Sequence, residues 1–154
     1  MSEHKEEEAF ETFVDIIAKL RGENGCPWDK EQTFESLKPC MVNEMTEALA
    51  GIDLYTQTGN AENLCEELGD VLMQVVLLSQ IAREKGLFDI TDVIKGISEK
   101  MIRRHVFGAP GTEVPDWEAI KQQEKQQRSR ELEQAEKAAF RAAAGQIICH
   151  LSER

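Results

Sequence analysis

The amino-acid sequence predicts an all-α protein with a four-helix-bundle-like core and an additional C-terminal helix. Apolar residues recur at spacings of three and four along most of the chain, which is the period of one face of an α-helix. Aromatic residues make up only 6% of the sequence, whereas β-sandwiches and barrels favour aromatic and β-branched residues in their strands. No segment alternates polar and apolar residues for long enough to predict a strand.

Turn formers and capping residues divide this pattern into separate helices. Thr58, Gly59 and Asn60 form a predicted turn between two long helices, and Gly86 is a predicted helix stop. Asp29 begins a capping-box-like pattern, so we expect a short helical restart there. The main helices are expected at about residues 5–20, 38–57, 60–85, 89–104 and 117–130.

The chain of 154 residues has the length of one domain. The apolar period weakens beyond Arg130. We therefore expect a domain over residues 1–130, followed by a helical or loosely ordered tail over residues 131–154.

The charge of the chain excludes some classes of partner. Asp and Glu number 29 against 18 Lys and Arg, which gives a net charge of −11. Such a surface repels phosphate backbones and anionic lipids, so we expect no nucleic-acid partner and no membrane partner. Residues 71–82 are the most apolar stretch and are too short to span a bilayer. With no signal sequence and no Cys-x-x-Cys pair, the expected location is the cytoplasm, with the four cysteines reduced.

Two pairs of carboxylates are the strongest candidates for a functional site. Glu44 and Glu47 are three residues apart on the second main helix, and Glu67 and Asp70 are three apart on the third. An i,i+3 pair points to one side of a helix, and the short turn makes the two helices antiparallel neighbours, so the pairs can meet. Four converging carboxylates repel one another unless a cation binds. Oxygen ligands suit Mg²⁺, Mn²⁺ or Ca²⁺ rather than zinc.

Two other interpretations of these acidic residues compete with a cation site. They could be ordinary solvated glutamates on the helix faces of an acidic protein. A di-iron carboxylate bundle would require Glu-x-x-His on two helices. None of His4, His105 and His150 follows a candidate glutamate at that spacing, so the di-iron interpretation is rejected.

Several short blocks follow one another in order along residues 10–125. The first is Gly-Cys-Pro-Trp-Asp-Lys-Glu-Gln-Thr at residues 25–33, and the next two are Asn-Glu-Met-Thr-Glu at 43–47 and Glu-Leu-Gly-Asp at 67–70. Further blocks lie at residues 86–89, 99–108 and 117–121. Together they resemble the MazG family of nucleoside triphosphate pyrophosphohydrolases: the first block is similar to the family's entry segment, and the next two are similar to its acidic signature. The sequence departs from the family pattern at Asn43, where a glutamate is usual, and in the shorter block at residues 105–107.

The resemblance implies a MazG-like fold, at least a homodimer, and Mg²⁺-dependent hydrolysis of (d)NTPs to (d)NMP and pyrophosphate. Mn²⁺ is a candidate substitute for Mg²⁺. The implied role is house-cleaning or nucleotide-pool control. It also implies that the catalytic metal ligands are Glu44, Glu47, Glu67 and Asp70.

The family also implies residues that bind the substrate. Lys100, Arg103 and Arg104 are expected to contact the triphosphate, although cations are also favourable at a helix C-terminus for purely structural reasons. Trp117 is expected either to stack on the base or to anchor the last helix.

Two alternative functions remain open from the sequence. One is an enzyme like the related phosphoribosyl-ATP pyrophosphohydrolase. The other is a non-catalytic helical regulator of the same fold, which the departure at Asn43 motivates.

Overall fold

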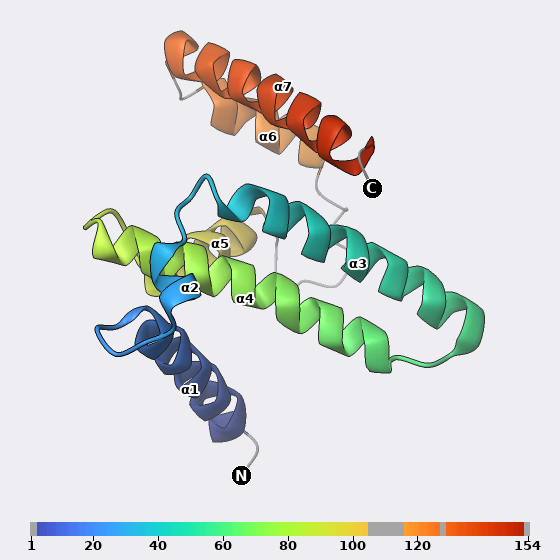
Figure 1. Cartoon of the computed structure of the whole chain (residues 1–154). Helices are drawn as coiled ribbons and strands as arrows, with labels where there is room; N and C mark the ends of the chain where they lie inside the picture. Colours follow the sequence, from blue (N-terminus) through green and yellow to red (C-terminus); the bar gives the residue numbers. More distant parts are fainter. Residues whose placement is uncertain (1–2, 105–115, 127–128, 153–154) are drawn as a thin grey trace. The chain divides into compact units, whose positions relative to one another are not determined.

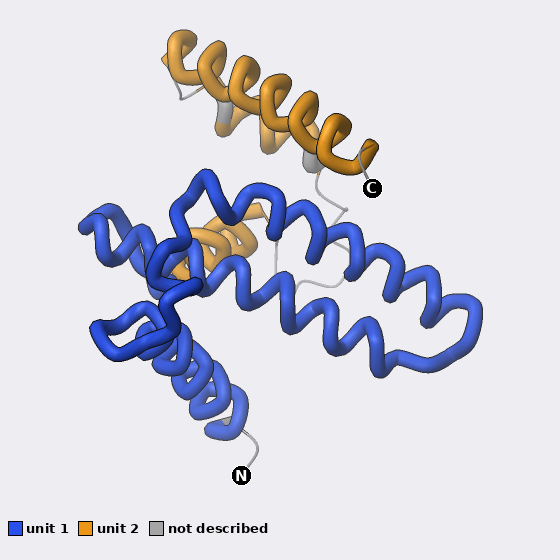
Figure 2. The backbone as a smooth tube through the Cα atoms, in the orientation of Figure 1, with its two compact units in different colours: residues 1–91 blue, residues 92–154 orange. Residues whose placement is uncertain are grey.

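The computed structural model describes residues 3–104, 116–126 and 129–152, and these residues form seven helices and no strand. The predicted all-α class is therefore confirmed. The chain forms two compact units, Met1–Thr91 and Asp92–Arg154 (Figure 2). The helices are α1 Glu3–Arg21, α2 Pro27–Glu31, α3 Leu37–Thr58, α4 Glu62–Glu84, α5 Ile90–Arg104, α6 Trp117–Gln126 and α7 Arg130–Ser152 (Figure 1).

The first unit is built on an antiparallel pair of long helices, α3 and α4, which run side by side (Figure 1). The predicted turn between them is present. Gly59 has a φ of 74° and donates its N–H to the Tyr55 carbonyl at 2.8 Å, which closes the end of α3. Asn60 Oδ1 then accepts a hydrogen bond from the Glu62 N–H at 2.8 Å. This turn sets the direction in which α4 runs back along α3.

The two helices approach each other closely where α3 carries a glycine. A Cβ atom built on Gly51 would lie 3.1 Å from Asn63 Oδ1 and 3.2 Å from the Leu64 Cα. Both contacts are tight for a Cβ atom, and the Leu64 Cα belongs to the backbone. The absence of a side chain at position 51 therefore lets α3 and α4 pack at this distance.

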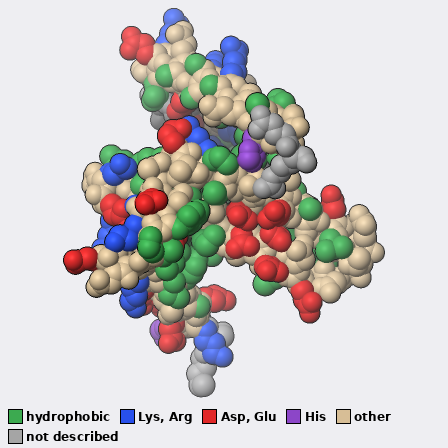
Figure 3. Space-filling model, viewed as in Figure 1, with side chains coloured by type: hydrophobic (Ala, Val, Ile, Leu, Met, Phe, Trp, Pro, Cys, Tyr) green, Lys and Arg blue, Asp and Glu red, His purple; other side chains and the backbone are tan. Residues whose placement is uncertain are grey.

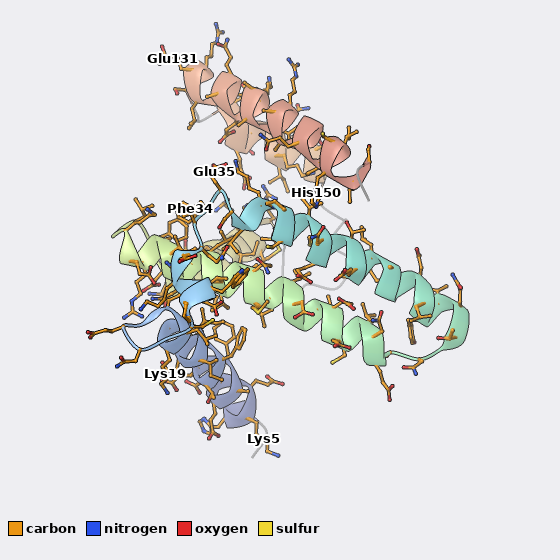
Figure 4. All side chains as sticks on the ribbon, in the orientation of Figure 1. Lys5, Lys19, Phe34, Glu35, Glu131 and His150 are labelled. Atoms are coloured by element: carbon orange, nitrogen blue, oxygen red, sulfur yellow. The ribbon has the colours of Figure 1, made fainter. Side chains whose placement is uncertain are left out.

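The apolar core lies where α1 and the start of α3 pack on the second half of α4. Each residue of this core is at least 98% buried. The core residues are Ile17, Leu37, Val76, Leu77 and Ile81. Phe10, Phe13 and Phe34 pack against this core, and Phe34 is labelled in Figure 4. The predicted apolar stripe of the first helix is thus the face that α1 buries.

The short helix α2 begins at Pro27 and not at Asp29, which corrects the predicted restart. Proline suits the first position of a helix because its φ is already helical and its missing N–H would have no helical partner there. Cys26 occupies the N-cap position with an extended backbone. Asp29 instead lies in the first turn, where its charge favours the positive end of the helix.

A buried arginine joins three of these elements. The Arg21 side chain is only 7% exposed, and its Nε and Nη2 donate to the Glu84 carboxylate at 2.8 and 2.6 Å. Its Nη1 donates to the carbonyls of Asp29 and Gln32. The hydrogen bonds from Arg21 hold the pKa of Glu84 below its ordinary value. Arg21 therefore ties the end of α1 to α2 and to the end of α4.

The second unit contains α6, α7 and most of α5. Asp116 caps α6, since its Oδ1 accepts hydrogen bonds from the backbone N–H groups of Glu118 and Ala119 at 3.0 and 3.1 Å. The helix α7 has no buried residue. Residues 105–115, between the helices expected at 89–104 and 117–130, lie outside the described residues. None of the described helices is both long and apolar enough to cross a bilayer.

Candidate metal centre

Three carboxylates from the two long helices converge in the first unit. Glu44 on α3 and Glu67 and Asp70 on α4 each place one carboxylate oxygen within 4.8 Å of the others, and all three side chains are half-buried. Figure 3 shows acidic side chains gathered over the middle of the α3–α4 pair. The structure thus brings together three of the four residues that the sequence pattern selected.

The fourth predicted ligand, Glu47, does not belong to this group of three. Its side chain is exposed, although its charge is one of the causes that raise the pKa of Glu44. Three residues along a helix turn the side chain by about 60° away from its neighbour, so one member of the pair can face α4 while the other faces outward. A metal-binding role of Glu47 stays a prediction.

The carboxylates affect one another electrostatically. The pKa of Glu44 is raised, first by burial and then by repulsion from Asp70, Glu47 and Glu67. Each of these causes disfavours the charged form of Glu44. A cation between the carboxylates would remove this repulsion, so the group has the electrostatics of a cation site.

Asn63 orients one of the carboxylates, and the sequence analysis did not select it. Its Nδ2 donates a hydrogen bond to Glu67 Oε1 at 2.9 Å. The two residues are four apart on α4, a spacing at which helical side chains meet. Asn63 also lies against Gly51, so the close approach of the helices fixes the amide that holds Glu67. The sequence does carry a signal for this role, because Asn63 precedes the candidate ligand Glu67 by four residues, the spacing at which an amide and a carboxylate meet on a helix.

The geometry of the three oxygens fits a hard divalent cation. Adjacent oxygen ligands of Mg²⁺ lie about 3.0 Å apart and opposite ones about 4.2 Å apart, because each bond is about 2.1 Å long and the shell is octahedral. The three oxygens, which lie within 4.8 Å of one another, would need to draw together by roughly 1–2 Å, a distance that side-chain rotation can supply. The group contains no cysteine or histidine, so its chemistry suits Mg²⁺ or Mn²⁺ better than zinc.

The basic residues predicted to contact a triphosphate lie on α5, in the second unit. Arg103 and Arg104 both pair with Glu124 on α6; Arg103 Nη2 donates at 2.6 Å. These hydrogen bonds, led by that from Arg104, lower the pKa of Glu124 to about 2. Lys100 is half-buried and forms no ion pair with any other described residue.

Arg103 keeps donors that Glu124 does not use. A guanidinium has five N–H groups, and the contacts of Arg103 with Glu124 engage its Nε and Nη2. The side chain of Arg103 is 57% exposed, whereas that of Arg104 is 13% exposed. Arg103 is therefore the more accessible of the two. The side chain of Trp117, the first residue of α6, lies outside the described part of the chain, as does His105.

Comparison with known proteins identifies the region that carries these residues. A family model described as the MazG nucleotide pyrophosphohydrolase domain matches residues 32–107. This range includes the three clustered carboxylates, Glu47 and the basic residues of α5. It ends before Trp117.

Curated relatives share a larger part of the chain. The nucleoside triphosphate pyrophosphohydrolase/pyrophosphatase MazG of Thermotoga maritima is 52% identical over 119 residues, which cover 75% of this chain and 45% of that protein. A nucleoside triphosphate pyrophosphohydrolase of Escherichia coli is 41% identical over 125 residues, or 76% of this chain and 46% of its own length. The uncharacterized protein YabN of Bacillus subtilis is 50% identical over 123 residues, 24% of its length. The chain thus spans half or less of these relatives.

Proposed function

We propose that this chain, a member of the MazG nucleotide pyrophosphohydrolase family, hydrolyses nucleoside triphosphates. The proposed products are nucleoside monophosphates and pyrophosphate. The observation that carries the proposal is the convergence of Glu44, Glu67 and Asp70 within the matched range. The proposed cofactor is Mg²⁺, with Mn²⁺ as a substitute, because the three ligands are carboxylates.

The chain's own residues supply most of the proposed mechanism. Glu44, Glu67 and Asp70 would hold the cation, and Asn63 keeps Glu67 turned toward it. When bound, a divalent cation neutralises charge on the phosphates and activates water as a nucleophile. Glu47, three residues after Glu44 on α3, is proposed to join the ligand set or to orient water.

The substrate contacts proposed outside the metal centre are those that the sequence selected. Lys100 and Arg103 are proposed to bind the triphosphate through their available donors, with Arg104 supporting Arg103 through the shared partner Glu124. Trp117 is proposed to stack on the base.

A homodimer or a higher homo-oligomer is part of the proposal. Met45, Leu49 and Ile52 lie at spacings of four and three on α3 and are 46%, 60% and 46% exposed. Leu68 and Leu72 on α4 are 54% and 41% exposed. Apolar side chains exposed along one helix face are typical of an interface, and we propose that a second copy of the chain covers them.

We also propose a cytoplasmic location and a role in control of the nucleotide pool. No disulfide joins the cysteines of the described residues, and structural disulfides are rare in a reducing compartment.

The proposed function is tested by pyrophosphate release from a panel of NTPs and dNTPs. Purified protein is assayed with Mg²⁺, with Mn²⁺ and with a chelator in place of the metal. We expect release from at least one nucleotide with either metal and none with the chelator. Nucleotide binding without release from any substrate would favour the regulator instead.

A further inference from the structure

Gln74 on α4 is a buried polar side chain with an unpaired atom. It is 2% exposed, and its Oε1 has no hydrogen-bond partner among the residues that the structure describes. A buried amide oxygen without a partner is unfavourable, and such atoms are rare in native proteins. Ser79, the other buried polar residue of the described core, does have a partner, because its hydroxyl donates to the Val75 carbonyl at 2.8 Å. Gln74 therefore calls for a donor from elsewhere.

The position of Gln74 on the helix indicates where that donor lies. Gln74 follows Asp70 by four residues, which places it about 6 Å further along α4 and about 40° around it. It follows Glu67 by seven residues, so it lies within about 20° of that side chain. Gln74 thus shares the face of α4 that carries two of the three clustered carboxylates.

The direction of helical side chains brings the amide nearer still. In an α-helix the Cα–Cβ bonds tilt toward the N-terminus, so a long side chain covers the turn that precedes its own Cα. For Gln74, the preceding turn carries Asp70. The carboxylates themselves cannot pair with Oε1 when ionised, because they offer acceptors only.

We propose that Gln74 Oε1 accepts a hydrogen bond from a water in the hydration shell of a divalent cation held by Glu44, Glu67 and Asp70. This inference rests on the proposed metal centre. Mg²⁺ in proteins usually keeps several of its waters, and each is a donor. Gln74 Oε1 is too deeply buried for a nucleoside to reach it, but a single water molecule is small enough to do so. Gln74 would thereby support the cation without contacting it, and such indirect contacts commonly change metal affinity 10- to 100-fold.

The test measures Mn²⁺ binding to the full chain in the absence of nucleotide. The electron paramagnetic resonance signal of free Mn²⁺ reports how much of the metal remains unbound. Gln74→Met keeps the length of the side chain but removes its oxygen, and we expect its dissociation constant to rise about 10- to 100-fold. Gln74→Glu keeps an acceptor, so it should bind at least as tightly as the wild type. Ser79→Ala is the matched control for a buried polar group on the same helix, and it should bind like the wild type.

The Mn²⁺ affinities of the variants distinguish the ways in which this inference could be wrong. If the wild type binds Mn²⁺ and Gln74→Met binds it equally well, Gln74 does not support the cation, although the metal centre stands. A Gln74→Met variant with unchanged Mn²⁺ affinity and a raised KM for NTPs would show a substrate contact instead. Equal weakening in both Gln74 variants, with lower unfolding midpoints, would show a purely structural amide. A wild type that binds no Mn²⁺ would overturn the metal centre and this inference together.

Discussion

Glu44 and Glu47 differ in environment although they lie one helical turn apart. Glu44 is half-buried between α3 and α4, and its pKa is raised by burial and by the neighbouring carboxylates. Glu47 is exposed, and it acts on the group by repelling the Glu44 carboxylate. At the scale of single residues, the direction of each side chain therefore divides the predicted ligands into a converging group of three and an outer member.

Alanine substitutions test this division. Asp70→Ala removes a proposed ligand from the converging group, so we expect turnover and Mn²⁺ affinity to fall at least about 100-fold. Unfolding of the metal-free variant should occur at an equal or slightly higher temperature, because one repelling charge is gone. Glu47→Ala, the matched comparison, should lose less than Asp70→Ala in both measurements. Near-normal turnover of Asp70→Ala at low Mg²⁺ would refute the ligand assignment.

The α3–α4 pair positions the three clustered carboxylates of the proposed metal centre through backbone contact as well as side chains. Gly51 permits the close approach, and Asn63 on the facing helix both touches Gly51 and holds Glu67. A change at position 51 should therefore affect stability and the metal centre together. Gly69, also on this helix pair, has no atom within 4 Å of a built Cβ.

Two glycine substitutions separate packing from helix propensity. Gly51→Val should lower the free energy of unfolding by about 1–3 kcal/mol, because the new side chain meets the Leu64 backbone. Gly69→Ala should raise it by about 0.5–1 kcal/mol, because alanine has less conformational freedom to lose in a helix. Urea unfolding of the metal-free proteins measures both. Equal stabilisation by the two changes would contradict the close approach at Gly51.

The contact between Arg21 and Glu84 should make stability depend on pH. The pKa of Glu84 in the folded chain lies below its ordinary value of 4.5, so the stabilisation is complete above that value and is lost as the pH falls through the lower folded pKa. Glu84→Gln should cost about 1–2 kcal/mol at pH 7. Urea unfolding from pH 7 to pH 3 should show the difference from the wild type shrinking in acid.

The control for this contact is a surface ion pair. Glu35 and Lys38 lie 2.6 Å apart with side chains that are 79% and 53% exposed. Glu35→Gln should change the free energy of unfolding by less than about 0.5 kcal/mol at any pH. A pH-independent effect of Glu84→Gln would show that its contribution is packing rather than charge.

At the scale of the whole molecule, the sequence predicted the helices better than it predicted which side chains meet. The ends of α3 and α4 were predicted to within a few residues because Gly59 and Gly86 adopt the positive φ that ends a helix. The start of α2 was missed because Pro27 outweighs the capping pattern at Asp29. Spacing could not separate Glu44 from Glu47, since that depends on how α3 is rotated against α4. Burial of Gln74 likewise depends on tertiary packing, which no local pattern encodes.

Assembly is the prediction that concerns the molecule as a whole. Leu49→Glu combined with Ile52→Glu places charges in the exposed apolar stripe of α3, which should convert the proposed oligomer to a monomer. Leu87→Glu is the control, because Leu87 is 62% exposed but lies outside the helix pair. Sedimentation at micromolar concentration distinguishes the species. A wild type that sediments only as a 17.4 kDa monomer would contradict the proposed assembly.

The identity of the reaction products tests the central claim most directly. Phosphorus-31 NMR follows an NTP incubated with the wild type and Mg²⁺, beside Asn43→Glu, which restores the family's usual carboxylate. Because an amide at position 43 can still orient water or phosphate by hydrogen bonding, the wild type should be active, and the variant should differ only in rate or metal optimum. We predict nucleoside monophosphate and pyrophosphate from the wild type. Nucleoside diphosphate with inorganic phosphate, or an inactive wild type rescued by Asn43→Glu, would contradict the account.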